Sequence, residues 1–241
     1  MLIAAAVCPH PPLLVPEATG AAGAGDPELD RLRAVCREAV AALLATAPDL
    51  IVVAGPAAHT AEYPPQAVAS LREFGIPYPA AVPGPGTQSL PLALTVGKWL
   101  LAQAGTGTAW WGIATDAPPA ECLELGGKLA ALAPRVGFLV LGDGPGRRAR
   151  NAPGAADFAA AVYEDRVAAA LAAADHDGLA ALPPAQDAEL FSTGRPAWQV
   201  LAGAAAGAAF DAELRYAGAP FEVAYFVASW HRRDNTSARA D

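Results

Sequence analysis

Leu2-Ile3-Ala4-Ala5-Ala6-Val7-Cys8-Pro9-His10-Pro11-Pro12, at residues 2–12, joins an apolar run directly to a cluster of prolines. The run over residues 2–7 is short and uninterrupted, which predicts a buried strand. Proline lacks the backbone N–H and fixes its own φ angle, so the strand cannot continue through the cluster. We therefore expect His10 in a rigid loop at a strand end, where a histidine can serve as a metal ligand or an acid–base group. The alternative is that His10 hydrogen-bonds nearby backbone and caps the strand.

Further apolar runs along the chain alternate with segments of helical periodicity. Strands that alternate with helices predict a mainly parallel sheet with helices on both faces. A short loop joins the last two strands, which makes them antiparallel neighbours. The predicted fold is a three-layer α/β/α sandwich with a mainly parallel, mixed central sheet. Its later strands are expected over residues 50–54, 109–114, 136–141, 214–216 and 223–230, and its helices over 26–47, 89–101, 120–133, 155–174, 187–190 and 196–206.

The composition is that of one folded domain, which we expect over residues 1–230, with a polar tail over 231–241. A hydrophobic fraction of 54% can bury a large core, and a charged fraction of 17% argues against disorder. The net charge of −8 argues against a nucleic-acid partner, because phosphate binding needs a basic surface. No apolar run reaches the roughly 20 residues that a membrane helix needs, and no targeting segment is recognisable. The three scattered cysteines have no metal-ligand spacing, which predicts free thiols and a cytoplasmic location.

Two polar residues follow other predicted strands at the edge where ligands bind in such sheets. His59 lies in the loop after the second strand, and Asp143 lies in Gly-Asp-Gly-Pro-Gly after the fourth strand. Two histidines and a carboxylate form the facial set that holds Fe(II) in oxygen-activating enzymes. His10 and His59 are therefore the candidate metal ligands, and Asp143 could bind the metal, orient a histidine or line the substrate pocket. The alternatives are an exposed loop histidine for His59 and a turn-forming aspartate for Asp143.

Arg195 and Trp198 begin a late predicted helix. We expect them to close a pocket for an aromatic or anionic ligand. A weaker alternative is a hydrolase that uses His10 and Asp143 without a metal, which requires those two side chains to meet at one pocket.

The segment from Val7 to Glu17 resembles the opening of the catalytic chain of class III extradiol ring-cleavage dioxygenases, and that of the related Memo-like proteins. The resemblance continues over residues 48–53, 138–143 and 194–196. It implies an α/β/α sandwich and a non-haem Fe(II) held by two histidines and a glutamate, with a further histidine as acid–base group. The reaction it implies is insertion of dioxygen into a catechol ring next to the hydroxyls.

On this resemblance His10 matches the first iron ligand, and three other positions depart from the family pattern. The family's second ligand directly follows a proline, whereas Ala57 follows Pro56 here and His59 comes two residues later. No histidine closely follows Asp143, and residues 195–199 contain no glutamate.

Two hypotheses follow from these matches and departures. The first is an Fe(II)- or Zn-dependent enzyme that cleaves a small aromatic molecule. The second is a re-purposed, non-catalytic binding or scaffold protein that holds no metal. In either case the apolar loop from Pro64 to Pro85 is the expected interface if copies of the chain form a homo-oligomer.

Overall fold

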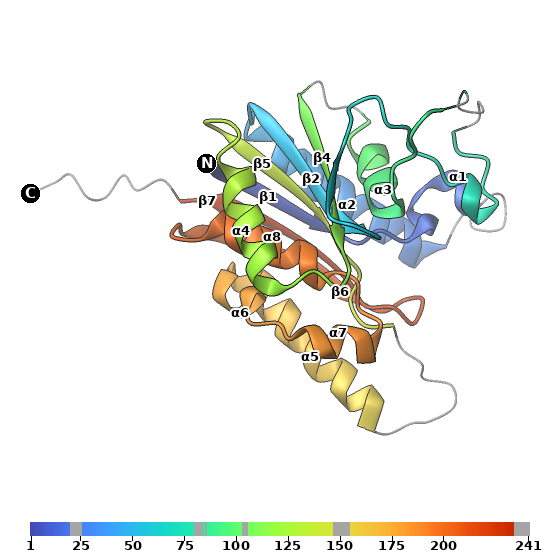
Figure 1. Ribbon diagram of the computed structural model, residues 1–241. Helices are drawn as coiled ribbons and strands as arrows, with labels where there is room; N and C mark the ends of the chain where they lie inside the picture. The colour runs from blue at the N-terminus through green and yellow to red at the C-terminus, as the bar shows by residue number, and fades with distance from the viewer. Residues whose placement is uncertain (20–25, 80–83, 85, 103–105, 147–154, 234–241) are drawn as a thin grey trace, which may run out of the picture.

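The computed structural model describes residues 1–19, 26–79, 84, 86–102, 106–146 and 155–233. Its middle layer is a seven-stranded sheet in the order β3-β4-β2-β5-β1-β7-β6 (Figure 1). The four strands β4, β2, β5 and β1 pair in parallel, while β3, β7 and β6 are antiparallel to their neighbours. The sheet is therefore mixed and mainly parallel at its centre, as predicted. The strands are β1 Leu2–Cys8, β2 Leu50–Ala57, β3 Ala61–Tyr63, β4 Thr108–Ala114, β5 Val136–Leu141, β6 Phe210–Gly218 and β7 Tyr225–Arg232.

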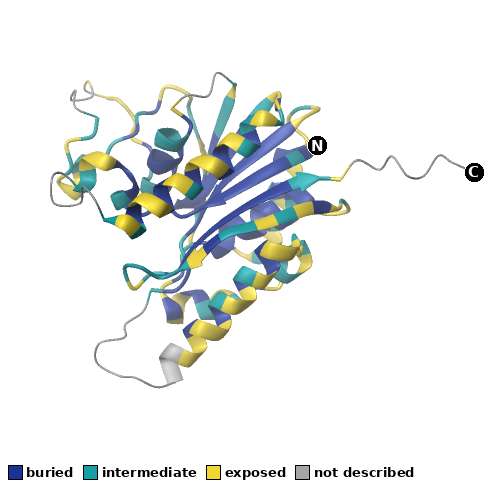
Figure 2. Cartoon of the chain, turned by 180° about the vertical axis from the view of Figure 1, so that it is seen from behind, coloured by how far each residue is buried: buried dark blue, intermediate teal, exposed yellow. Residues whose placement is uncertain are grey.

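Helices cover both faces of this sheet and make the other two layers (Figure 1). The central strands are buried on both sides, so alternate residues of one strand enter different cores (Figure 2). Val52 and Ala54 pack toward one layer, whereas Ile51 and Val53 pack toward the other. One layer contains α1 Pro16–Thr19, α2 Pro27–Ala45 and α3 Leu92–Leu100, with the 3-10 turns Pro12–Leu14 and Arg72–Phe74. The other contains α4 Pro119–Ala130, α5 Ala155–Ala173, α6 His176–Ala180, α7 Pro184–Leu190 and α8 Arg195–Ala205.

The start of α2 shows how the sequence fixes a helix end. Asp26 is the N-cap, and its side-chain oxygen accepts hydrogen bonds from the backbone N–H groups of Glu28 and Leu29, at 3.0 and 3.1 Å. Pro27 occupies the first helical position, where no N–H partner is needed. Both features agree with the prediction from the sequence.

Strand β2 continues three residues further than predicted, through Pro56 to Ala57. The backbone N–H of Ile51 points toward β4, because it donates to the carbonyl of Gly107 at 2.9 Å. N–H directions alternate along a strand, so the nitrogen of Pro56 faces β5. Pairing of β2 with β5 ends at Ala54, whereas pairing with β4 continues to Ala57. The strand therefore tolerates this proline because no ladder bond is required there.

Other boundaries also differ from the predictions. Helix α3 begins at Leu92 after Pro91, and not at Ser89, while β3 and α6 have no counterpart among the predicted elements. Strand β7 runs to Arg232, so His231 belongs to the sheet and not to the expected tail. Residues 234–241 of that tail lie outside the described part of the chain. None of the described helices is both long enough and apolar enough to cross a membrane.

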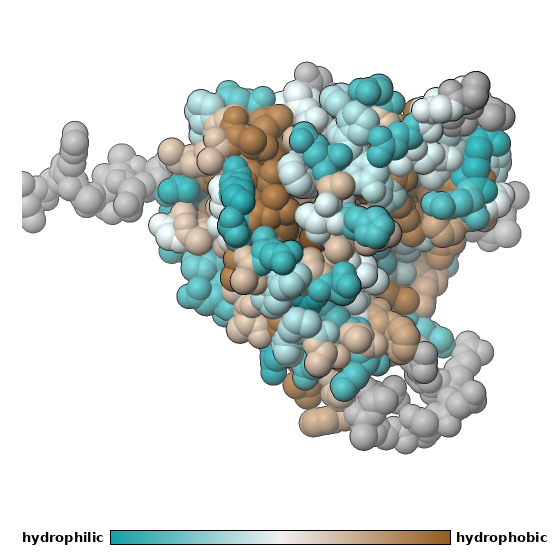
Figure 3. All heavy atoms as spheres, viewed as in Figure 1, coloured by the Kyte–Doolittle hydropathy of each residue, from teal (hydrophilic) through white to brown (hydrophobic). Residues whose placement is uncertain are grey.

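Helix α4 covers the neighbouring strand β4 only in part, since Ala109, Trp111 and Ala114 of that strand are partly exposed. A shallow cavity of about 210 Å³ runs beside this helix, between Ile113 of β4 and Leu125. The space-filling view shows apolar atoms gathered in a strip on this face (Figure 3). Trp111 of β4 packs only partly against the core on this side.

Candidate functional site

His10 and Asp143 meet at the carboxyl ends of two adjacent parallel strands. Strand β1 pairs with β5 up to the partners Cys8 and Leu141, so the residues that follow both strands emerge side by side. The backbone N–H of His10 donates a hydrogen bond to Oδ1 of Asp143 at 2.8 Å. The same oxygen lies 3.3 Å from Nδ1 of the His10 ring, but the two are not aligned as a hydrogen bond. The contact between the side chains is therefore electrostatic.

Burial determines the electrostatics of this pair. His10 is 6% exposed, and the side chain of Asp143 is 17% exposed. Burial raises the pKa of the Asp143 carboxyl above its usual range, and the His10 ring acts in the opposite direction. Burial also raises the pKa of Tyr225, with the negative charge of Asp143 as the second cause. Within the described residues, Nε2 of His10 and Oδ2 of Asp143 have no hydrogen-bond partner.

The backbone of Asp143 is held from behind by the segment that leads into α8. Its carbonyl oxygen accepts hydrogen bonds from the N–H groups of Thr193 and Gly194, at 3.1 and 2.9 Å, and from the Ser192 hydroxyl at 3.3 Å. The contact is close because glycines meet there: a β-carbon on Gly142 would lie 2.6 Å from Cα of Gly194. Asp143 is thus fixed in place before any ligand arrives.

His59 lies elsewhere, on an exposed turn between β2 and β3. This turn bends over the end of β4, where the hydroxyl of Thr60 accepts a hydrogen bond from the backbone N–H of Ala114 at 3.0 Å. Strands β2 and β5 separate β4 from β1. At an interstrand spacing of about 4.8 Å, the ends of β4 and β1 are about 14 Å apart. The structure therefore does not bring His59 to His10.

The positions of His10, Asp143 and His59 decide whether this site can hold the expected metal ion. Fe(II) in a facial site needs three protein ligands around one point. No group of three histidine, cysteine, aspartate or glutamate side chains suited to a metal occurs among the described residues. His10 has Asp143 beside it but no third ligand in this part of the chain. The described residues thus do not fit the expected Fe(II) or Zn site.

Arg195 is buried at 1% exposure in a polar network. Its Nε donates to Asp187, whose other carboxylate oxygen accepts from the Tyr163 hydroxyl at 2.6 Å. Its Nη1 donates to Oε1 of Gln199 at 2.7 Å and to the carbonyl of Ala117 at 3.1 Å. Burial raises the pKa of Asp187, while Tyr163 and Arg195 act in the opposite direction. This network connects α5, α7 and α8 and so fixes the segment behind Asp143.

Arg195 also lines a cavity of about 340 Å³ at the carboxyl edge of β4. Trp198 does not line this cavity. It is fully buried and packs edge-on against Phe226, with ring centroids 5.9 Å apart, and its Nε1 has no partner among the described residues. The expected pairing of Arg195 and Trp198 in one pocket wall is therefore not what the structure shows. The cavity is lined by Thr115, Asp116, Pro184, Asp187, Ala188, Phe191, Ser192, Thr193 and Arg195.

Comparison with known proteins adds the fold alone. No family and no curated protein matches this sequence. The fold is similar to that of an uncharacterized protein, JW3007, from Escherichia coli K12. That crystal structure matches with a TM-score of 0.50 and 13% sequence identity, over 95% of this chain and 99% of that chain. The α/β/α architecture is therefore shared across nearly the full length of both chains.

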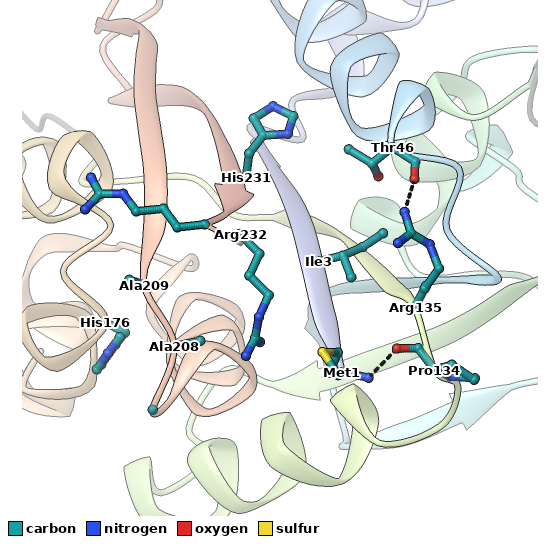
Figure 4. A pocket seen from close by; sticks show the side chains of 12 residues that line it. Met1, Ile3, Thr46, Pro134, Arg135, His176, Ala208, Ala209, His231 and Arg232 are labelled. Carbon is teal, nitrogen blue, oxygen red and sulfur yellow. Dashed lines mark hydrogen bonds between the residues drawn. The ribbon is translucent and has the colours of Figure 1, made fainter. Parts of the chain in front are cut away.

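A larger cavity, of about 1130 Å³, lies at the opposite edge of the sheet (Figure 4). Arg135, Arg232, Arg233, His176 and His231 line it. The C-terminal ends of α2, α4 and α8 also lie there, since residues that follow these helices line the same cavity. Helix C-termini carry partial negative charge and attract cations. Arg135 donates to the carbonyl of Thr46 at 2.6 Å, directly after α2. The helix ends explain Arg135, whereas Arg232 donates to the carbonyl of Leu2 and Arg233 pairs with Asp211.

Sequence reasoning missed the polar partners of Arg195. Tyr163 and Asp187 lie in segments with helical periodicity. The sequence does not show whether an aspartate in such a segment is buried or exposed. The one signal for this network was the position of Asp187, a charged residue in the first turn of a predicted short helix that closely precedes Arg195. Two further polar residues lie away from this network: Glu17 is in α1, and His176 begins α6, where its Nδ1 lies 3.1 Å from Asp177.

Proposed function

We propose that this protein is a re-purposed member of its fold that binds a small hydroxylated aromatic molecule at His10 and Asp143, without iron. The observation that carries the proposal is the buried contact between these two side chains at adjacent strand ends. His59, which an iron site would need, lies on an exposed turn over β4. The aromatic character of the ligand rests on the resemblance of residues 7–17 to the extradiol dioxygenases.

The pair offers complementary groups to a hydroxyl. Oδ2 of Asp143 can accept a hydrogen bond from the ligand's O–H, and Nε2 of His10 can accept or donate according to its protonation state. An imidazole that takes the proton of the hydroxyl becomes a cation, which would stabilise the phenolate form of the ligand. The residues can therefore bind a hydroxyl and move its proton, and no described group supplies a third metal ligand.

The test is metal content and ligand binding measured on the same protein. The chain is purified anaerobically and incubated with Fe(II), alongside His10→Ala, and bound metal is measured by mass spectrometry. Catechol and 1,2-dimethoxybenzene are then compared by calorimetry. We expect far less than one metal per chain in both proteins, and binding of catechol but not of its methylated analogue. His10→Ala should weaken catechol binding about tenfold, the equivalent of one charge-assisted hydrogen bond.

Ring cleavage is the second candidate, favoured by the position of His10 at the carboxyl end of β1. Near-stoichiometric iron that disappears in His10→Ala, together with oxygen uptake on catechol, would establish it and reject the metal-free proposal. We further propose a cytoplasmic location, which the three free buried cysteines support. Assembly into a homo-oligomer through residues 64–85 stays a prediction.

A further inference from the structure

Helix α5 lies at the margin of the molecule, and its outer face is largely apolar although it is exposed (Figures 1 and 2). Phe158 is 74% exposed and Val162, one turn later, is 42% exposed. The inner face packs on the core through Ala160, Tyr163, Val167, Ala170 and Leu171. Among the described side chains of α5, the other exposed residues are Ala159, Ala161, Asp165, Arg166, Ala169, Ala172 and Ala173. A helix that is apolar on nearly every side is normally buried, so this face predicts a partner.

Five of the exposed residues form one stripe along the helix. They follow one another at intervals of three or four positions, which is the spacing of a single helix face: Phe158, Val162, Asp165, Ala169 and Ala173. At a rise of about 1.5 Å per residue, the stripe is about 22 Å long. Its first half carries the large apolar side chains, and its second half carries alanines.

Two opposite charges, Asp165 and Arg166, lie at the middle of this stripe. Adjacent residues of a helix point about 100° apart, so these two side chains do not face each other. The residues three and four positions away from either one are uncharged, so neither has an ion-pair partner along its own helix. Both charges are therefore available to a charge on another molecule.

A two-fold axis through the middle of the stripe makes its shape complementary to itself. Two copies of α5 related by this axis run antiparallel, and residues equally far from the middle face each other. Phe158 then lies opposite Ala173 of the partner subunit. Val162 lies opposite Ala169 of the partner subunit. Each large side chain thus meets a small one, which allows the two helices to approach closely.

The same symmetry pairs the charges. Asp165 lies opposite Arg166 of the partner subunit, and the axis repeats this contact, so a dimer contains two such pairs. A parallel arrangement would instead place like charges together. We propose that α5 is the interface of a homodimer, in which it packs antiparallel against α5 of a second copy. One helix pair is at the small end of protein interfaces, so the dimer is reversible and depends on concentration.

The first test is sedimentation velocity of the full chain at pH 7, from about 1 to about 500 μM, which covers the affinities of small interfaces. We expect the mass to rise from that of one chain to that of two. Phe158→Ser removes the most exposed apolar side chain of the stripe, so it should weaken the dimer at least tenfold. The matched control is Leu132→Ser, because Leu132 is 54% exposed and lies outside α5. It should leave the mass unchanged.

The second test exchanges the two charges. Asp165→Arg places arginines opposite each other across the axis, and Arg166→Asp does the same with aspartates, so each should weaken the dimer about fivefold. The double variant with both substitutions restores opposite charges and should return the affinity to within about twofold of the wild type. Lys128→Glu, an exposed charge reversal on α4, is the control and should have no effect.

Four results would overturn the proposal: a single-chain mass at every concentration, a dimer that survives Phe158→Ser, an equal loss in Leu132→Ser, or a double charge variant no tighter than the single ones. A dimer formed through residues 64–85 would give the second of these results. All the substituted residues are exposed, so unchanged circular dichroism is expected and confirms folding. The interface uses neither His10 nor Asp143, so His10→Ala should dimerise like the wild type whatever that site binds.

Discussion

Oδ1 of Asp143 accepts the backbone N–H of His10 at 2.8 Å and also lies 3.3 Å from the imidazole of the same residue. One oxygen thus fixes both the main chain and the ring of His10. The position of His10 depends on the shape of the Asp143 side chain, whereas the electrostatic contact depends on its charge. The two contributions can be separated by substitution.

Asp143→Asn should stabilise the folded protein at neutral pH. Burial raises the pKa of Asp143 above its unfolded value, so the folded state favours the protonated carboxyl, and stability from this residue is lost as pH rises through the folded pKa. Asparagine keeps an oxygen acceptor for His10 and carries no charge. The free energy of unfolding in urea should therefore exceed that of the wild type at pH 7, with the difference fading toward pH 3. An equal difference at both pH values would contradict this, and exposed Asp177→Asn is the control.

Asp187→Ala should destabilise the protein by about 3–5 kcal/mol, because it leaves Arg195 as an unpaired buried charge. Arg195→Met should cost a similar amount, because it leaves the Asp187 carboxylate unpaired. The double variant should cost clearly less than the sum, since neither charge is then left alone. Urea unfolding of the four proteins completes the cycle. Strict additivity would show that the two side chains do not interact.

Gly126→Ala and Gly127→Ala should have opposite effects although the residues are adjacent in α4. A β-carbon on Gly126 would overlap the carbonyl of Val200 in α8, whereas the nearest atom to one on Gly127 is 4.0 Å away. We expect Gly126→Ala to cost about 1–3 kcal/mol by overpacking. Gly127→Ala should gain up to about 1 kcal/mol from helix propensity. Thermal unfolding measures both, and a loss at Gly127 would show that the space beside it is not free.

The three cysteines should be unreactive until the protein unfolds. Cys8, Cys36 and Cys122 are all free and buried. Burial raises the pKa of Cys122 to about 11. The thiolate is the reactive form, and at pH 8 only about one Cys122 thiol in a thousand is ionised. Ellman's reagent at pH 8 should label no thiol quickly in the native protein and three in urea. Rapid labelling of one native thiol would contradict the packing at that position.

The sequence predicts most elements but not the order of strands in the sheet. Apolar runs and helical periodicity leave local patterns, so β1, β2, β4, β5 and the long helices can be recognised. The proximity of His10 to His59 requires β1 and β2 to be neighbours, whereas β5 lies between them. That order arises from packing between distant segments and has no local signature. His10 and Asp143 meet because β1 and β5 are adjacent. The Asp187–Arg195 pair is close in sequence and escapes prediction for another reason, because the residue types alone do not show that both side chains are buried.

The gathering of basic side chains at the amino edge of the sheet makes the molecule electrically uneven. The chain carries 24 acidic and 16 basic residues, yet three of its arginines and two of its four histidines surround a single hollow. The net charge of −8 therefore does not describe how the protein binds to a charged matrix. Cation-exchange and anion-exchange resins would bind opposite ends of the molecule. Immobilisation on either resin would therefore orient the protein. On a negatively charged support the amino edge would face the matrix, leaving the edge with His10 and Asp143 open to solution.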